Sequence, residues 1–149
     1  MKDAMENAKE ELKRIDHLIY VTLKYTRTVD VFLSVIERMI NAYEFLVDVL
    51  IKLAVKEGRL IEEPDIPLAK AQEVLKLFDS KKIKDNVEHY LMLRKLRRAN
   101  YEKTNEFRRH VTMTAIVEGK VITVNIDTIT EDFHELKDFI EYVEKKISL

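Results

Sequence analysis

The residues most able to do chemistry gather in the stretch LRKLRRANYEKTNEFRRHVTMTA, Leu93 to Ala115. Seven Arg and Lys residues meet only two Glu residues there, a local net charge of +5 in a chain whose net charge is −1. Such a cluster of cations favours a partner that carries phosphate groups. The candidate nucleic-acid or phosphate-binding residues are Arg94, Arg97, Arg98, Tyr101, Arg108 and Arg109.

A second interpretation of the same stretch is structural. Cations near the C-terminus of a helix interact favourably with its dipole, and arginine stems cover apolar surface beside an acidic neighbour. Tyr101 and Phe107 could stack on bases among the arginines, or they could anchor the end of the helix. The sequence leaves both interpretations open.

One pair in this region suggests catalysis. If His110 faces Asp127 across a hairpin, the carboxylate would orient the imidazole and raise its basicity, while Arg108 or Arg109 holds a phosphate. That is the skeleton of a phosphodiester-cleaving site, although a solvated strand end would carry the same residues. We therefore assign no catalytic residue and keep His110 and Asp127 as an alternative.

Other chemistries lack their motifs. A chain with two Gly and no Cys has neither a glycine-rich phosphate loop nor a thiolate, and its many adjacent carboxylates are typical of solvated helix faces. We expect no cofactor. We also expect no metal site, because the histidines lie far apart and lack ligand spacing such as HExxH. These histidines are His17, His89, His110 and His134.

Composition predicts one helical domain over residues 1–149. The chain is 46% hydrophobic and 36% charged, and its N-terminus is charged, without the apolar segment of a signal peptide. Its apolar runs are too short to cross a membrane, so we expect a cytoplasmic protein with no membrane partner. Abundant Lys and Glu with a single Gln resembles the usage of thermophiles.

Apolar periodicity predicts five helices. The first is amphipathic and ends near Arg27, although one bent helix over residues 2–57 is an alternative. The second has apolar residues on more than one side, so it should be the central helix, with Gly58 as its stop. The second predicted helix covers Val29–Glu57 and the third Leu68–Phe78. The fourth runs from Lys82 into the basic stretch, and the fifth runs from Thr128, capped with Glu131, to Ile147.

A β-hairpin over about 110–127 is predicted before the last helix. Two β-rich runs flank Glu118-Gly119, and this turn pairs Ala115 with Ile122 and Met113 with Val124 on a buried face. Counting outward extends the ladder through further pairs. These are Thr114–Thr123, Thr112–Asn125, Val111–Ile126 and His110–Asp127.

The helical architecture, the Arg-rich stretch and the nearby His110 resemble the HEPN superfamily of helical bundles, found in RNA-cleaving toxins and in partners of nucleotidyltransferases. Active members carry an Arg and a His with four to six residues between them, at a dimer interface. Here the positions at that distance from His110 are Lys103, Thr104 and Asn105, so the motif is absent. The resemblance implies the architecture and gives no support for ribonuclease activity.

Two functions follow. We favour a non-catalytic interaction module that forms a homodimer through the long second helix or the hairpin, with a basic patch for RNA, DNA or an acidic protein. The alternative is a metal-independent HEPN-type ribonuclease or nucleotide-binding enzyme that uses Arg108, Arg109 and His110, with Asp127 as the orienting group.

Overall fold

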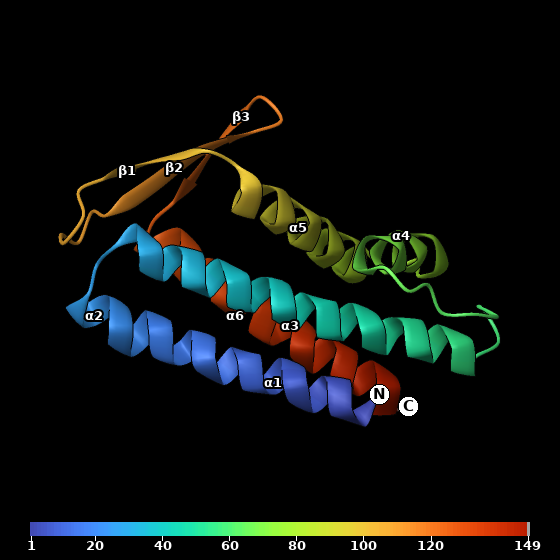
Figure 1. The fold of residues 1–149 in the computed structure, drawn as a ribbon. Helices are drawn as coiled ribbons and strands as arrows, with labels where there is room; N and C mark the ends of the chain where they lie inside the picture. The colour runs from blue at the N-terminus through green and yellow to red at the C-terminus, as the bar shows by residue number, and fades with distance from the viewer. Residues whose placement is uncertain (149) are drawn as a thin grey trace.

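The structure is a computed structural model that describes residues 1–148, a helical bundle with a small antiparallel sheet at one end (Figure 1). The predicted class, mainly helical with β structure before the last helix, is confirmed. Among the described residues, none of the helices has the length and apolar character that a membrane crossing requires. The elements are α1 (Lys2–His17), a π-helical turn (Leu18–Thr22), α2 (Leu23–Tyr25), α3 (Val29–Lys56), α4 (Pro67–Leu77), α5 (Lys81–Arg98), β1 (Tyr101–Thr104), β2 (Thr112–Val117), β3 (Lys120–Val124) and α6 (Ile126–Ser148).

Helix α3 is the centre of the bundle, as its apolar pattern predicted. It packs against α1, α4, α5 and α6, and sixteen of its 28 residues are buried. Its four exposed residues are all polar: Asp30, Ser34, Glu37 and Lys56. The apolar surplus that suggested dimerisation through this helix is therefore covered within the chain.

The helix ends follow local signals. The predicted break near Arg27 is confirmed, because α2 ends at Tyr25 and α3 begins at Val29. Gly58 adopts a φ of 75°, and its N–H donates to the Val55 carbonyl at 3.0 Å, which closes α3 as expected of a C-terminal glycine. Ser80 Oγ accepts the N–H of Ile83 at 3.3 Å and so caps α5.

The predicted hairpin register is confirmed between β2 and β3. Val117 faces Lys120, Ala115 faces Ile122, and the ladder ends at Met113–Val124. Met113, Ala115 and Val117 are buried against the bundle. The alternation of apolar and polar residues in β2 therefore fixed the register correctly.

The ladder beyond Val124 was predicted wrongly. The pairs Thr112–Asn125, Val111–Ile126 and His110–Asp127 do not form, because α6 begins at Ile126. Asn125 caps this helix: its Oδ1 accepts the N–H of Thr128 at 2.8 Å, and Thr128 Oγ1 accepts the N–H of Asn125 at 2.9 Å. The cap assigned to Thr128 and Glu131 is thus one turn too late.

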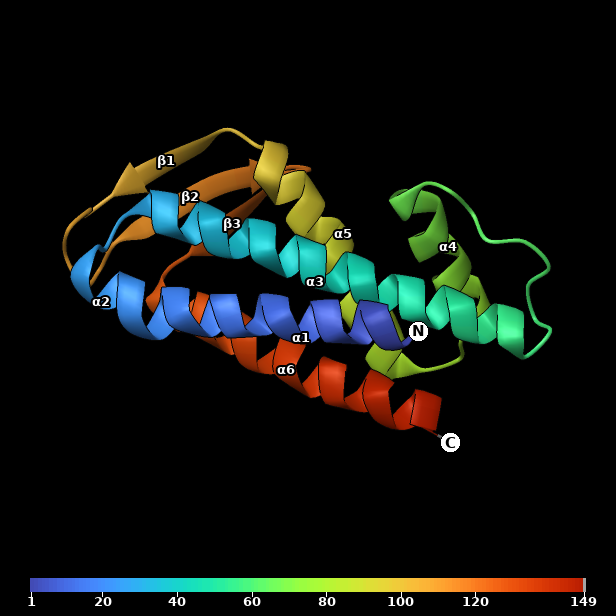
Figure 2. The same ribbon diagram turned by 60° about the horizontal axis from the view of Figure 1, so that its bottom comes forward.

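A third strand escaped prediction. Residues Tyr101–Thr104, expected to be the basic exit of a helix, form β1 and pair antiparallel with β2. All four residues are exposed, and Figure 2 shows β1 along the outer edge of the sheet. Because no face of β1 is buried, it lacks the alternation of apolar residues by which a strand is recognised in a sequence.

The loop between β1 and β2 docks on the start of α3. The Phe107 N–H donates to the Arg27 carbonyl at 2.7 Å, and Glu106 Oε2 accepts the Val29 N–H at 2.9 Å. Thr28, the residue before α3, makes no side-chain capping bond. Glu106 supplies the cap instead, and its negative charge also suits the positive end of the helix dipole.

Replacing Glu106 with Ala should lower the free energy of unfolding by about 1 kcal/mol, the usual effect of losing a helix cap. Urea unfolding followed by circular dichroism measures the change. Glu102→Ala, an exposed carboxylate on β1, is the matched control and should stay close to wild type. Equal losses for the two variants would contradict the capping role.

Candidate functional site

The docked loop brings distant cations together. Because Phe107 is bonded to Arg27, Arg108 and Arg109 come to lie beside the end of the first helical segment. Lys24, Arg27 and Arg109 line one hollow of about 300 Å³. We call the set Tyr20, Lys24, Arg27, Arg108 and Arg109 the basic junction.

The cations of the basic junction have no carboxylate partner. Within residues 1–148, no ion pair involves Lys24, Arg27, Arg108 or Arg109. The Nε atom of Arg27 is buried without a hydrogen-bond partner. Uncompensated cations at a concave surface form an electrostatic site for an anion.

An aromatic side chain completes this hollow. Tyr20 lies on the π-helical turn, is 48% exposed, and lines the hollow with Ile19 and Leu23. Its ring meets the ring of Phe133 edge-on, with 5.9 Å between centroids, and its hydroxyl lies 3.4 Å from His134 Nε2. These contacts hold the ring in place while leaving part of it open to solvent.

A second hollow, of about 210 Å³, adjoins the first and shares Arg109 and Ile126 with it. His110 and Asp127 both line it, but the described residues show no hydrogen bond between the two. Asp127 lies in the first turn of α6, where a negative charge is favourable. This hollow therefore brings together Arg109, His110 and Asp127 of the catalytic alternative, without Arg108 and without the predicted cross-strand pair.

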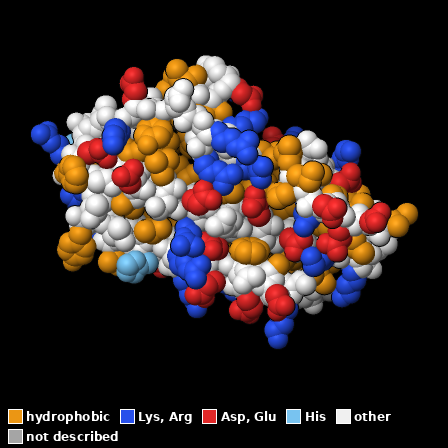
Figure 3. Space-filling view, viewed as in Figure 1, with side chains coloured by type: hydrophobic (Ala, Val, Ile, Leu, Met, Phe, Trp, Pro, Cys, Tyr) orange, Lys and Arg blue, Asp and Glu red, His pale blue; other side chains and the backbone are white. Residues whose placement is uncertain are grey.

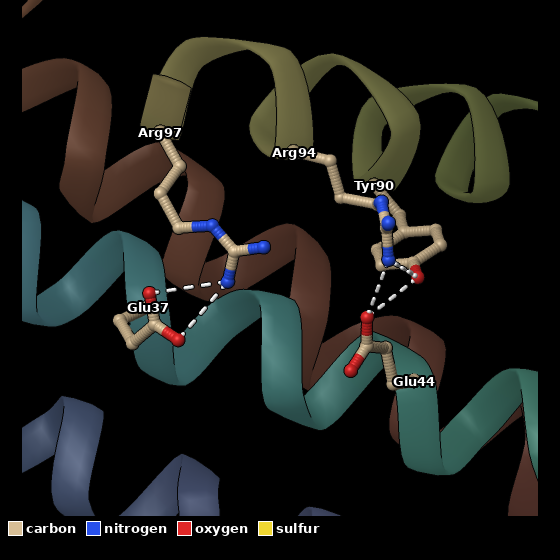
Figure 4. Close-up of polar contacts among 5 residues, drawn as sticks. All are labelled: Glu37, Glu44, Tyr90, Arg94 and Arg97. Atoms are coloured by element: carbon tan, nitrogen blue, oxygen red, sulfur yellow. Dashed lines mark hydrogen bonds and ion pairs between the residues drawn. The ribbon is translucent and has the colours of Figure 1, made fainter. Parts of the chain in front are cut away.

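Two arginines of the predicted patch pair with carboxylates of α3. Arg94 Nη1 donates to Glu44 Oε2 at 2.8 Å and to the Tyr90 hydroxyl at 3.0 Å, and Arg97 Nη1 donates to Glu37 Oε1 at 3.0 Å (Figure 4). Figure 3 shows the blue surface of α5 bordered by red surface of α3. The contacts of Arg94 and Arg97 therefore agree with the structural interpretation, in which arginines lie beside an acidic neighbouring helix.

The other residues of the predicted patch lie at separate places on the surface. Arg98 is exposed at the end of α5, and Tyr101 lies on β1 and lines a separate hollow on the outer face of the sheet. Lys95 pairs with Glu118, and Lys103 Nζ lies 3.5 Å from Glu106 Oε1. Of the six predicted phosphate-binding residues, only Arg108 and Arg109 belong to the basic junction.

Three members of the basic junction were missed from the sequence. Tyr20, Lys24 and Arg27 recur at steps of four and three residues, the spacing of one side of a helix, although Arg27 itself lies beyond the end of α2. That spacing was a usable signal for a shared face. Their proximity to Arg109 depends on the contact between the loop and Arg27, and the spacing of residues in the sequence gives no sign of it.

A buried polar cluster lies between α3, α5 and α6. His89 Nε2 is 3.7 Å from Asp132 Oδ2 and has no hydrogen-bond partner among the described residues. The Tyr43 hydroxyl donates to Asn86 Oδ1 at 3.2 Å, and its ring contacts His89 edge-on. Within residues 1–148, no three His, Asp or Glu side chains are arranged to hold a metal ion.

Burial sets the protonation states in this cluster. Burial, with the nearby charges of Glu135 and Glu131, raises the pKa of Asp132 to about 7. Burial also lowers the pKa of His89. Both shifts favour the neutral forms, because few polar groups replace the lost water.

Comparison of the chain with protein-family models, curated proteins and solved structures gives no match.

Asp132→Asn should make the protein more stable at alkaline pH. An unfolded Asp has a pKa of about 3.9, so the folded carboxyl holds its proton to higher pH, and the stability this contributes is lost as pH rises through about 7. Asparagine stays neutral throughout. The difference in unfolding free energy, variant minus wild type, should therefore increase by about 1 kcal/mol or more between pH 5 and pH 8.

Urea titrations at the two pH values measure this difference. Asp138→Asn, an exposed aspartate of the same helix, controls for the loss of one charge and should show a smaller increase. A difference that stays constant with pH in Asp132→Asn would contradict the assignment.

Proposed function

We propose that this protein is a non-catalytic helical module that binds single-stranded nucleic acid through the basic junction. The observation that supports the proposal most is the combination in one hollow of Lys24, Arg27 and Arg109 with the exposed ring of Tyr20. Proteins that bind single strands without sequence preference combine cations along the phosphates with aromatic rings on which bases stack.

The location of free charge favours the first hollow over the other basic surfaces. Arg94 and Arg97 are compensated by Glu44 and Glu37, and the second hollow contains the carboxylate of Asp127. The charged residues that line the first hollow are all cations. Two further exposed aromatic residues lie near its lining in sequence, Tyr25 at 81% and Phe107 at 76% exposure.

An acidic protein is the other partner that the sequence allowed. The basic junction would attract carboxylates as well as phosphates, but stacking on Tyr20 adds affinity only for bases. The resemblance to HEPN bundles stays a prediction and carries no part of this proposal.

Arg109→Ala should weaken binding of a short fluorescent oligoribonucleotide or oligodeoxyribonucleotide and lower the slope of log affinity against log salt by about 0.7 for each lost phosphate contact. Tyr20→Ala should weaken binding by about 1–3 kcal/mol with little change in that slope, because stacking releases no counterions. Fluorescence anisotropy over a range of salt concentrations measures both effects.

Arg97→Ala is the matched control, since it removes one arginine that pairs with α3. It should bind like wild type once folding is verified by circular dichroism. Wild-type protein without salt-sensitive binding would end the proposal, as would equal losses in Arg97→Ala and Arg109→Ala. Loss in Arg109→Ala without loss in Tyr20→Ala would contradict the stacking of bases on Tyr20.

A phosphodiester-cleaving enzyme is the second candidate, because His110, Asp127 and Arg109 line the same hollow. In that case His110→Ala should abolish RNA cleavage while circular dichroism and oligonucleotide binding stay unchanged, since a general base acts on the reaction and not on the phosphate contacts. Gel analysis of a labelled RNA, without added metal, measures the activity. Wild type that leaves the RNA intact would contradict this candidate.

A further inference from the structure

The sheet has two open edges. Its strand order is β1-β2-β3, and among the described residues β1 and β3 make backbone hydrogen bonds only to β2. Exposed edges are templates for pairing with another chain. Whether an edge can pair with the same edge of a second copy depends on which backbone groups face outward and on which side chains would lie opposite each other.

The turn fixes which groups of β3 face outward. Glu118 and Gly119 have φ of 50° and 78°, the two positive values of a type I′ turn, so Val117 and Lys120 form the closing hydrogen-bonded pair. Hydrogen-bonded pairs alternate along an antiparallel ladder. The N–H and C=O groups of Ile122 and Val124 therefore also point to β2, and those of Val121 and Thr123 point to the open edge.

We propose that β3 pairs antiparallel with β3 of a second copy and so forms a six-stranded sheet across a two-fold axis. In a symmetric pair the axis stands perpendicular to the sheet, and the register that joins all outward groups sets Val121 opposite Thr123 of the other copy. Ile122 then meets Ile122 of the second copy at the axis. This inference does not rest on the proposed nucleic-acid binding.

The side chains of β3 suit this pairing. Val121, Ile122, Thr123 and Val124 are all β-branched, and Val121 is 66% exposed in a single copy. Neighbouring β-branched residues across strands stabilise a sheet. The charged residue of the strand, Lys120, lies at its end and faces Val124 of the other copy, so no like charges oppose each other.

The same reasoning rejects self-pairing of β1. The backbone N–H and C=O groups of Thr112 and Thr114 point away from β3 and bond those of Thr104 and Glu102. The backbone groups of β1 that face the open edge therefore belong to Tyr101 and Lys103. Joining these groups across a two-fold axis would set Glu102 directly opposite Glu102. Like charges opposite each other destabilise a strand pair, which leaves β3 as the edge for a second copy.

The pairing would also bring a cation toward the second hollow. Lys120 of one copy faces Val124 of the other, and Val124 is adjacent to Asn125, which lines that hollow. The residues that line the first hollow are not part of the strand pair. Self-association and nucleic-acid binding can thus fail separately in experiments.

A single cysteine tests the register, because the chain has no cysteine of its own. In Ile122→Cys, the two sulfurs would meet across a non-hydrogen-bonded pair, where the Cα atoms lie about 4.5 Å apart and a disulfide fits. Under mild oxidation the cross-linked dimer should form about tenfold faster, or more, than in controls without this proximity. The controls are Ile116→Cys, exposed on the central strand, and Lys103→Cys on the β1 edge.

Size-exclusion chromatography with light scattering tests the wild type and Thr123→Pro. Proline removes an outward N–H and leaves the ladder to β2 intact, so the variant should be a folded monomer while wild type is a dimer that dissociates on dilution. Wild type that is monomeric at every concentration would overturn the inference. Larger open-ended species, or cross-linking of Ile122→Cys no faster than Ile116→Cys, would do the same.

Discussion

The burial of the apolar residues of α3 is the constraint on which the rest of the structure depends. A helix with so many apolar residues must be covered on every side, so α1, α4, α5 and α6 all pack against it. The few polar positions left on its surface then meet its neighbours. Glu37 and Glu44 receive Arg97 and Arg94 from α5, and part of the basic stretch thereby becomes a contact between helices.

The division of charge follows from this packing. The cations of α5 that lie beside α3 pair with its carboxylates, whereas Arg108 and Arg109, in the loop between β1 and β2, make no ion pair among the described residues. That loop is held by backbone groups at the α2–α3 connection, where Glu106 bonds Val29 and Phe107 bonds Arg27. One helix cap therefore stabilises the bundle and also positions the arginines that carry free charge.

The two faces of the sheet differ from each other, and so do its two edges. Its inner face is packed on the bundle through β2, and its outer face exposes Ile116 and Val121. Its two edges differ chemically, because β1 presents alternating charges and β3 presents β-branched residues. Natural sheets often protect an exposed edge with charged side chains, as β1 does with Glu102 and Lys103.

Several features were determined by the sequence alone. The apolar spacing of α3, the stop at Gly58, the cap at Ser80 and the turn at Glu118-Gly119 are local signals, and each acts over a few residues, so each could be recognised without tertiary contacts. The same holds for the register of β2 and β3, which a period of two residues fixes.

Only the tertiary structure decided which charges are free and which residues meet. The strand β1 has no buried face, and the early start of α6 depends on a cap at Asn125 that ended the expected ladder before His110 and Asp127 could pair. Arg109 joins Tyr20, Lys24 and Arg27 because a loop docks 77 residues away along the chain, through Glu106 and Val29. Local periodicity cannot encode such contacts, since they depend on where the loop and helix ends come together in space.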